Sequence, residues 1–507
     1  MNKKKIYLIG TVTCLFFTAC TLDTVPTDKY VEENFWKNSG QISAGLTACY
    51  NTMYNTYMYG SMLIFSETAT PNAYNYGNNG GWRVIGNGTL NLSNSAMVNS
   101  KWGSCYQGIG RCNTFIENSS SFDMEEDELN EMVGEAKFLR ALYYFDLTKN
   151  YGDAPLILEK PDVNTQSYLP RDPQEDIVVQ ILKDLDDAAL SLPVNPSQIG
   201  RATKGAAYAL KARVCLFFEK WDEAEKAADA VVALNKYSLY PDYRELFSLE
   251  HENNQEVIFD VQYQYPDITH SGDGLDVVLR QYNTIAPTLD LVRAYEWTDG
   301  KLYSDNPDRD LYTDRDPRFY ATIVYPGATY MGKTVENTTF INTGYTYKKF
   351  AKYDEAAATM DDTNDINLIL LRYADVLLMK AEARNELLAA PDQAVYDAIN
   401  AVRGRQSVNM PQYNMATDNF TKEQMREKIR HERRIELAGE GVYYDDIRRW
   451  RIAENVMNAD VLKYDGSRVE TRTFSSKNYL WPLPQQEIDD NPNLLPNNPG
   501  WETTSTE

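Results

Sequence analysis

The stretch that decides the fold is "TKGAAYALKARVCLFFEKWDEAEKAADAVVAL", residues 203–234. Apolar side chains recur at steps of three and four residues on both sides of Trp221, which predicts two successive amphipathic helices. Thr203 stands where it can cap the first helix. Small alanines at the expected crossing let two antiparallel helices approach closely. The expected buried stripes are Ala207, Leu210, Val214 and Phe217, then Ala224, Ala227, Ala228 and Val231.

A second copy of this pattern lies at residues 371–405, "LRYADVLLMKAEARNELLAAPDQAVYDAINAVRGR". The repeated form, a helix, a short turn and an Ala-rich helix, resembles a tetratricopeptide unit, whose helices stack against their neighbours. Long insertions separate the copies, so the spacing is irregular. Two more pairs are expected from apolar periodicity, which gives four pairs in all. They lie near residues 39–118, 124–190, 203–235 and 367–403.

The stretches between these pairs have another composition. Residues 67–99 are dense in Asn, Gly and Ser, which favour turns, and we expect a long surface loop there. "EVIFDVQYQY" from residue 256 and "FYATIVY" from residue 319 each predict a short strand. Residues 262–350, the irregular region, are rich in Tyr, Gly and Asp. Long loops of this kind carry binding sites in many proteins.

The amino terminus has the pattern of a targeting segment. Three lysines precede an apolar block at residues 6–17, which is too short to span a bilayer and suits a signal peptide over residues 1–19. Cys20 follows directly, where a bacterial lipoprotein carries its acylated thiol, and several acyl chains would hold the protein on a membrane. A plain secretory signal, with Cys20 incidental, is the alternative.

Composition excludes some classes of function. A formal charge of -23 argues against nucleic acid, because binding a phosphate backbone requires Lys and Arg. The mature chain would keep Cys49, Cys105, Cys112 and Cys215, too few for a disulfide framework, and buried thiols are expected. Tyrosine is unusually frequent, with 36 copies, and offers a flat apolar face together with a hydroxyl. That combination suits sugar rings.

Eight stretches in order along the chain resemble the SusD/RagB family of outer-membrane lipoproteins of Bacteroidetes. They are "CTLDTVPTD" at residue 20, "EAKFLRALYYFDLTKNYGDAPLI" at 135, "RAYEWTDGK" at 293, "DRDPRFYATI" at 314, "LLRYADVLLMKAEARNEL" at 370, "INAVRGR" at 399, "RHERRIELAGEGVYYDDIRRW" at 430 and "LWPLPQQEIDDNPNLLPNNPGW" at 480. The chain departs from the family pattern at Tyr443 and in its "NNPGW" ending. Both departures are interpreted as packing variants.

The resemblance implies a mostly α fold: a right-handed superhelical body of four tetratricopeptide-like pairs, with an irregular half, including residues 66–99 and 262–350, that carries the ligand site. It makes residues 20–507 a single SusD-like domain. It also implies a partner, a SusC-like TonB-dependent transporter barrel, over which the lipoprotein would close as a lid. The expected location is the outer membrane, lipid-anchored and facing the cell exterior.

The candidate glycan site rests on aromatic side chains. A sugar ring presents hydrogens on one face and hydroxyls around its rim, so a binding site needs flat platforms with polar groups beside them. The alternative is that these rings pack on the body or face the transporter, and Trp297 is interpreted as structural. The 67–99 segment offers Tyr74, Tyr76 and Trp82 with Asn75, Asn78, Asn79 and Arg83, and the irregular region offers Tyr265, Tyr282 and Tyr330. Replacing Trp82 by Ala is expected to weaken glycan binding with little change in melting temperature.

Metal and catalytic motifs are weak. His431-Glu432 lacks the second His, four residues on, that a zinc site needs; Ile435 stands there, and Glu432 is expected to form solvated ion pairs. "SDNPDRD" at residue 304 could hold calcium through Asp305, Asp308 and Asp310, or be a plain turn.

Carboxylate pairs that a glycosidase could use are interpreted as helix, turn or surface charges. These pairs are Asp445 with Asp446, Asp314 with Asp316, and Asp361 with Asp362.

The predicted function is non-catalytic capture of an oligosaccharide, which is then passed to the transporter. No cofactor is expected, although calcium is possible. Two alternatives stay open: a peptide cargo within the same assembly, as in RagB-like members, and a surface glycoside hydrolase. An Asn-rich aromatic loop fits sugars better than peptides, which need backbone partners and side-chain pockets.

Overall fold

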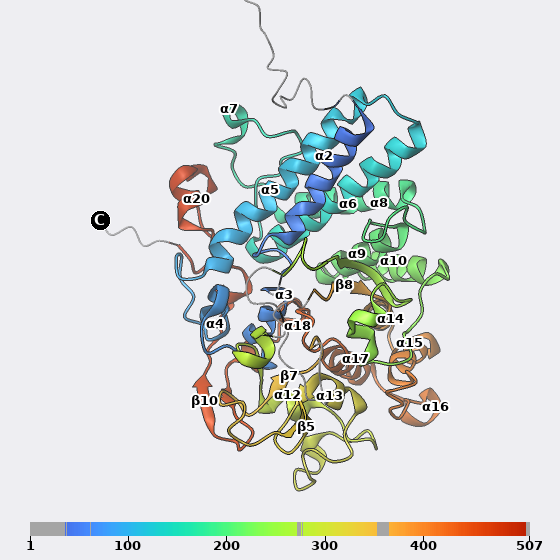
Figure 1. Ribbon diagram of the computed structural model, residues 1–507, viewed down its shortest axis with the longest axis vertical. Helices are drawn as coiled ribbons and strands as arrows, with labels where there is room; N and C mark the ends of the chain where they lie inside the picture. Colours follow the sequence, from blue (N-terminus) through green and yellow to red (C-terminus); the bar gives the residue numbers. More distant parts are fainter. Residues whose placement is uncertain are drawn as a thin grey trace, which may run out of the picture.

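The computed structural model describes residues 36, 38–60, 62–270, 275, 277–351 and 365–502 (Figure 1). The predicted signal peptide, Cys20, Asp361 and Asp362 lie outside these ranges. Within them, each helix is too short or too polar to cross a membrane. The α-helices are α2 Ser39–Asn51, α3 Met62–Phe65, α4 Trp82–Gly86, α5 Ala96–Asn118, α6 Glu126–Tyr151, α7 Val163–Gln166, α8 Gln174–Ser191, α9 Lys204–Phe217, α10 Trp221–Ala233, α12 Leu289–Ala294, α13 Pro317–Thr322, α14 Tyr373–Leu387, α15 Gln393–Arg403, α16 Met415–Asp418, α17 Lys422–Glu436, α18 Tyr443–Arg449, α19 Ala453–Met457 and α20 Gln485–Asp490.

The long helices pack as the sequence repeat predicts. Helix α2 packs on α5, α6 on α8, α9 on α10 and α14 on α15, and contacts of α5 with α6, α8 with α9 and α10 with α14 join these pairs into one body. Figure 1 shows α2, α5, α6 and α8 side by side at one end, with α9, α10, α14 and α15 continuing the stack. The prediction of a mostly helical fold is confirmed.

Local chemistry explains why α9 and α10 form where predicted. The Thr203 hydroxyl accepts a hydrogen bond from the backbone N–H of Ala206 at 3.1 Å, so it caps α9. Ala224 and Ala228 of α10 are fully buried, which lets the α10 backbone approach its neighbours. Their small side chains therefore set the close helix crossing.

The strands are short and pair two by two. β2 and β8 form the longest ladder, antiparallel with Val261 opposite Leu368, and β2 confirms the strand expected from residue 256. The strand expected from residue 319 is largely wrong, because Asp316 caps α13 with Pro317 as its first residue, leaving only β4. The strands are β1 Ala73–Tyr74, β2 Val257–Val261, β3 Ala286–Pro287, β4 Ile323–Val324, β5 Thr329–Tyr330, β6 Lys333–Thr334, β7 Thr346–Tyr347, β8 Leu368–Arg372, β9 Asp460–Leu462 and β10 Arg468–Thr471.

Single turns of helix fill much of the remaining chain. They are η1 Thr52–Tyr54, η2 Ser66–Ala69, η3 Asn79–Gly81, η4 Ser119–Ser121, η5 Glu245–Phe247, η6 Leu249–His251, η7 Val277–Gln281, η8 Tyr303–Asp305, η9 Ser476–Tyr479 and η10 Pro492–Leu494. All belong to the 3₁₀ type except η7, which is a π-helix.

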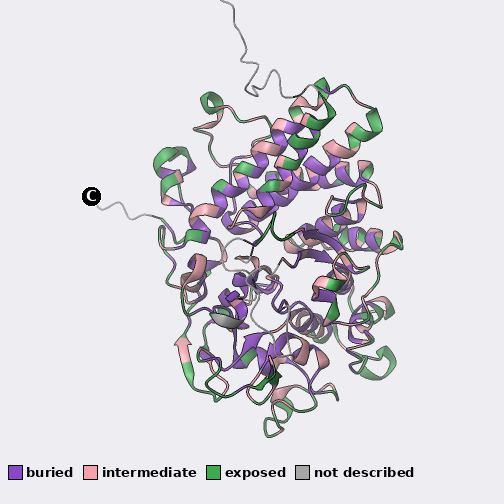
Figure 2. Ribbon diagram, viewed as in Figure 1, coloured by how far each residue is buried: buried purple, intermediate pink, exposed green. Residues whose placement is uncertain are grey.

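One large core runs through both the helical body and the irregular region. Figure 2 shows buried residues along the inner faces of the long helices and in the centre, with exposed residues on outer turns. The four described cysteines are free and buried, as expected. Trp297 is fully buried and its indole N–H donates to the Asp310 carbonyl at 3.3 Å, which agrees with a structural role.

Candidate functional site

Two exposed tyrosines flank the paired strands β1 and β3. The antiparallel ladder pairs Ala73 with Pro287 and Tyr74 with Ala286, so Tyr76 and Tyr282 lie on the segments that leave the same end of it. Tyr76 follows β1 by two residues and Tyr282 precedes β3 by four, and their rings are 43% and 42% exposed. We call this the Tyr76–Tyr282 surface. It joins two segments that are more than two hundred residues apart in the sequence.

Arg83 holds the Tyr76 side of this surface in place. Its Nη1 donates to the Tyr76 carbonyl at 2.9 Å, while its Nε donates to Glu470 of β10 at 2.9 Å. The guanidinium also lies 5.6 Å from the centre of the Tyr74 ring, close enough for a cation–π contact. Arg83 is half-buried, so it stiffens the loop and still reaches solvent.

The predicted asparagines shape the loop. The Asn75 side-chain oxygen accepts from the Gly77 N–H at 2.9 Å, and Asn75 is buried. The Asn78 oxygen accepts from the Val84 N–H at 3.2 Å, and Asn78 itself adopts a left-handed backbone conformation. Both amides satisfy backbone donors that a turn would otherwise leave unpaired.

The surface loop expected at residues 67–99 is wrong for most of its length, and Trp82 is not at the surface. Trp82 is 5% exposed and makes edge-on contacts with Tyr444 and Trp481, at ring distances of 5.6 and 5.9 Å. Gly81, with φ +84°, lies so close to Ser95 that a Cβ would fall within 2.5 Å of it. This turn aims the first residue of α4 into the core. Tyr74 is also buried, at 6% exposed.

The remaining candidate rings lie elsewhere. Tyr265 is 52% exposed, in a turn closed by the bridge between Gln264 and Ile268. Tyr330 is 6% exposed and packs with Val324, Val335 and Phe340 in a small separate core cluster. Its burial argues against a role as a sugar platform.

The calcium candidates act as turn residues. Asp305 accepts from the Leu302 N–H at 2.8 Å, and Asp310 accepts from the Tyr312 N–H at 2.9 Å. Throughout the described ranges, including Asp308, no group of three His, Cys, Asp or Glu side chains is arranged to hold a metal ion. The structure therefore does not bring the three carboxylates together.

Four charged residues of the "RHERRIELAGEG" run, Glu432, Arg433, Glu436 and Glu440, are buried, which corrects the expectation that Glu432 forms solvated pairs. Glu432 is 1% exposed and binds Arg318 at 2.5 Å and Arg403 at 2.8 Å. Burial alone would raise the pKa of Glu432, but these arginines hold it below its usual value. Asp316 and Asp446, expected among helix, turn or surface charges, are likewise buried, against Arg318 at 2.8 Å and Arg433 at 3.0 Å.

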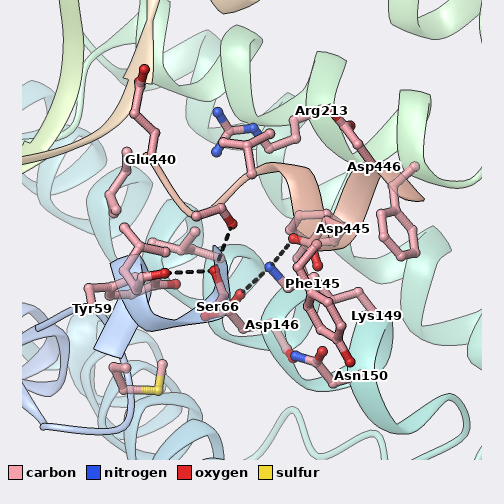
Figure 3. A pocket seen from close by; sticks show the side chains of 18 of the residues that line it. Tyr59, Ser66, Phe145, Asp146, Lys149, Asn150, Arg213, Glu440, Asp445 and Asp446 are labelled. Atoms are coloured by element: carbon pink, nitrogen blue, oxygen red, sulfur yellow. Dashed lines mark hydrogen bonds and ion pairs between the residues drawn. The ribbon is translucent and has the colours of Figure 1, made fainter. Parts of the chain in front are cut away.

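A small cavity of about 100 Å³ lies between helices α5, α6, α9 and α18, with Trp82 and Trp481 also in its wall (Figure 3). At its wall, Lys149 of α6 lies between Asp146, at 2.8 Å, and Asp445 of α18, at 2.8 Å. Lys101 of α5 also binds Asp146, at 2.7 Å. Burial alone would raise the pKa of Asp146, but the two lysines lower it well below its usual range. These ion pairs join α5, α6 and α18, and sequence reasoning did not find them.

Comparison with known proteins shows which protein family has this architecture. The SusD family model matches residues 248–501, and the model described as "Starch-binding associating with outer membrane" matches residues 22–216. SusD-like protein P2 of Formosa agariphila is 27% identical over 99% of this chain and all of its own length.

Solved structures with a similar fold belong to the same family as these sequence matches. A SusD-like carbohydrate-binding protein of Bacteroides fragilis superposes with a TM-score of 0.82 at 29% identity, over 91% of this chain and all of that one. A laminarin-binding SusD-like protein superposes with a TM-score of 0.73 at 25% identity, over 92% of this chain and all of that one. With one model over half of the chain and relatives matching along nearly all of it, the protein belongs to the SusD family, a family of carbohydrate-binding proteins.

Proposed function

We propose that this protein captures an oligosaccharide on the Tyr76–Tyr282 surface and does not alter it. The observation that carries the proposal is that Tyr76 and Tyr282 are both exposed and lie on the segments just outside the paired strands β1 and β3. Flat apolar faces suit the hydrogen-bearing faces of sugar rings, and Arg83 adds a donor at the rim. Asn75, Asn78 and Arg83 shape the segment that carries Tyr76, and Tyr74 and the exposed Tyr265 belong to the same candidate set.

The state of Asp445, one of the carboxylates that the sequence offers for a glycosidase pair, supports a role without catalysis. A glycosidase needs one carboxyl group whose pKa is raised beside a second carboxylate. Asp445 is instead paired with Lys149 and Arg448. Burial alone would raise the pKa of Asp445, but those two cations lower it overall. A carboxyl group held as a paired anion is a poor general acid.

The cargo would pass to a SusC-like TonB-dependent transporter, with Cys20 as the lipid anchor after removal of residues 1–19. The family description of association with the outer membrane supports this location, and the lysine-rich and apolar amino-terminal sequence supports export. Binding of moderate strength suits a protein that must release its cargo inward.

The test is a binding screen of the mature protein against laminarin, amylopectin, xylan and a peptide mixture. We expect one glycan to bind without products, and Tyr76→Ala and Tyr282→Ala each to weaken binding about tenfold, or about 1.4 kcal/mol. Tyr168→Ala, at a ring that is 66% exposed on another part of the molecule, is the matched control and should bind normally. Peptide binding alone, sugar products, or unchanged binding by both variants would refute the proposal.

A further inference from the structure

A second hollow lies in the irregular region, apart from the Tyr76–Tyr282 surface. It is a groove of about 630 Å³ between residues 310–312, residues 326–337 and the turn that joins β9 to β10. Two tyrosines, Tyr312 and Tyr464, line it together with Asp310, Glu336, Asn337 and Asp465. We call it the Tyr464 groove. Its volume is within the range of small-molecule sites.

Both tyrosines of the groove are held by their surroundings. The Tyr312 hydroxyl is 2.9 Å from the Tyr345 hydroxyl, and its ring stacks on Tyr325 with centroids 4.7 Å apart. The Tyr464 N–H donates to the Thr343 carbonyl at 2.8 Å. Its ring lies against Gly344, φ +88°, where a Cβ would come within 2.4 Å of the ring. Rings fixed in this way lose little conformational entropy when a ligand stacks on them.

Polar groups surround these rings. Asp310 and Asp465 each use one oxygen, Oδ1, to accept hydrogen bonds from their own turns. Glu336 and Asn337 are exposed on the opposite rim. Among the described lining residues there are three carboxylates and no cationic side chain, so the groove repels anionic ligands and offers acceptors to hydroxyl groups.

The groove and the Tyr76–Tyr282 surface share supports. The β9–β10 hairpin, whose pairing sets Leu462 opposite Arg468, carries Tyr464 in its turn and Glu470, the partner of Arg83, on its second strand. Across the other side, the Asn342 amide donates to the carbonyl of Asn283, the residue after Tyr282, at 3.1 Å. The next residue, Thr343, accepts from Tyr464. A short run of chain therefore separates the groove from Tyr282.

We propose that the Tyr464 groove is a second glycan subsite that takes uncharged sugar residues of the same chain bound at the Tyr76–Tyr282 surface. This rests on the proposed function for the first site. The rings supply stacking faces, the carboxylates and Asn337 bind hydroxyl groups, and the acidic lining excludes uronic or sulfated sugars. Two linked subsites raise the affinity for long chains without affecting short ones that fill one subsite.

The experiment is calorimetry of the mature protein with laminarin and laminaritriose, and with amylopectin and maltotriose. We expect Tyr464→Ala to weaken binding of the polysaccharide about tenfold and to leave trisaccharide affinity within about twofold, whereas Tyr282→Ala weakens both. Since Tyr464 packs on Gly344, the exposed double variant Glu336→Gln, Asn337→Ala serves as a second probe and should weaken polysaccharide binding several-fold. Polygalacturonate should not compete.

The outcomes separate the two proposals. If both groove variants bind the polysaccharide normally and Tyr282→Ala binds it weakly, the groove is not a glycan subsite and the proposal for the first site stands. Impaired groove variants with normal Tyr76→Ala and Tyr282→Ala remove the first site and leave the groove as the glycan site. Competition by polygalacturonate overturns the predicted preference for uncharged sugars, and no binding of any glycan overturns both.

Discussion

Helices α6 and α8 meet along apolar stripes that the sequence repeats every three or four residues, with Arg140 and Asp184 paired at 2.7 Å within that contact. The segment 67–99 is held differently. Its Pro71 carbonyl accepts from Thr288 at 2.5 Å, Asn72 accepts from Arg434 at 2.8 Å, and Arg472 donates to the Thr70 carbonyl at 2.5 Å.

These partners lie hundreds of residues away in the sequence, yet they decide which rings of the segment face solvent. The helical body is thus built from local patterns, whereas residues 67–99 and 262–350, the irregular half, are built from distant contacts. Candidate glycan residues lie in the half whose shape depends on those contacts. Each prediction below tests one side of this comparison.

The largest effect is expected where both halves share buried charge. Glu436 of α17 binds Arg405 at 2.7 Å, Arg372 at 2.8 Å and Arg318 at 2.9 Å, and its side chain is fully buried. Glu436→Gln removes the anion and leaves these arginines undercompensated, so we expect a loss of about 3–5 kcal/mol in the free energy of unfolding. Urea denaturation at pH 7 measures it.

A matched control lies on the same helix. Glu427 has a side chain 72% exposed, and Glu427→Gln should change stability by less than about 0.5 kcal/mol. Equal effects of the two substitutions would show that the buried network does not stabilise the fold.

Trp82→Ala tests whether distant contacts bury this ring. The indole is 5% exposed against Tyr444 and Trp481, so its removal should cost about 3–5 kcal/mol of stability. Tyr76→Ala, six residues earlier and 43% exposed, should cost less than about 0.5 kcal/mol. Thermal and urea denaturation of both variants give the comparison. A Trp82→Ala protein as stable as the wild type would contradict the burial of the Trp82 side chain.

Trp82 also marks how far the sequence could predict the molecule. Thr203 caps α9 through the Ala206 nitrogen, and the apolar stripes of α6 and α10 follow the helical period, so capping and periodicity predicted that these helices form. The family resemblance predicted the architecture. Trp82 and Tyr330 looked exposed because their neighbours in sequence are polar, but their burial depends on packing partners that only the folded chain supplies.

The same limit applies to the buried charges. Glu432 and Asp446 are charged residues. Their neighbours in the sequence do not show that arginines from other elements, Arg318 and Arg433, will bury them and pair with them. Tyr76 and Tyr282 were proposed separately, and only the β1–β3 pairing shows that the segments carrying them leave the same two-stranded ladder.

A pH-dependent effect of about 3 kcal/mol is expected from Glu67, at the root of the 67–99 segment. Its carboxyl group is fully buried and accepts from Asn72 at 3.0 Å and from the Gly441 N–H at 3.2 Å. Burial raises the pKa of Glu67 to about 7. The unfolded chain releases this proton near pH 4.5, so the folded state binds more protons between about pH 4.5 and 7, and stability falls as pH rises through that window.

The measurement is the free energy of unfolding at several pH values for the wild type and Glu67→Gln. The difference between the two should change by about 3 kcal/mol from pH 4.5 to 7.5, with the wild type losing stability relative to the variant, and should level off above pH 7. Parallel curves would mean that Glu67 is ionised at the same pH in both states.

The smallest effect belongs to the helical body and to a purely local contact. Thr203 caps α9 through its hydroxyl, 3.1 Å from the Ala206 nitrogen, and that hydroxyl also lies 3.2 Å from the Tyr237 hydroxyl. Thr203→Ala should reduce stability by about 1 kcal/mol, because one buried backbone donor at the helix start loses its acceptor. Thr203→Ser keeps the hydroxyl and should recover most of that loss in the same urea titration. An equally unstable Ser variant would assign the effect to the lost methyl group and its packing, and the start of the repeat would then depend on tertiary contacts as the irregular half does.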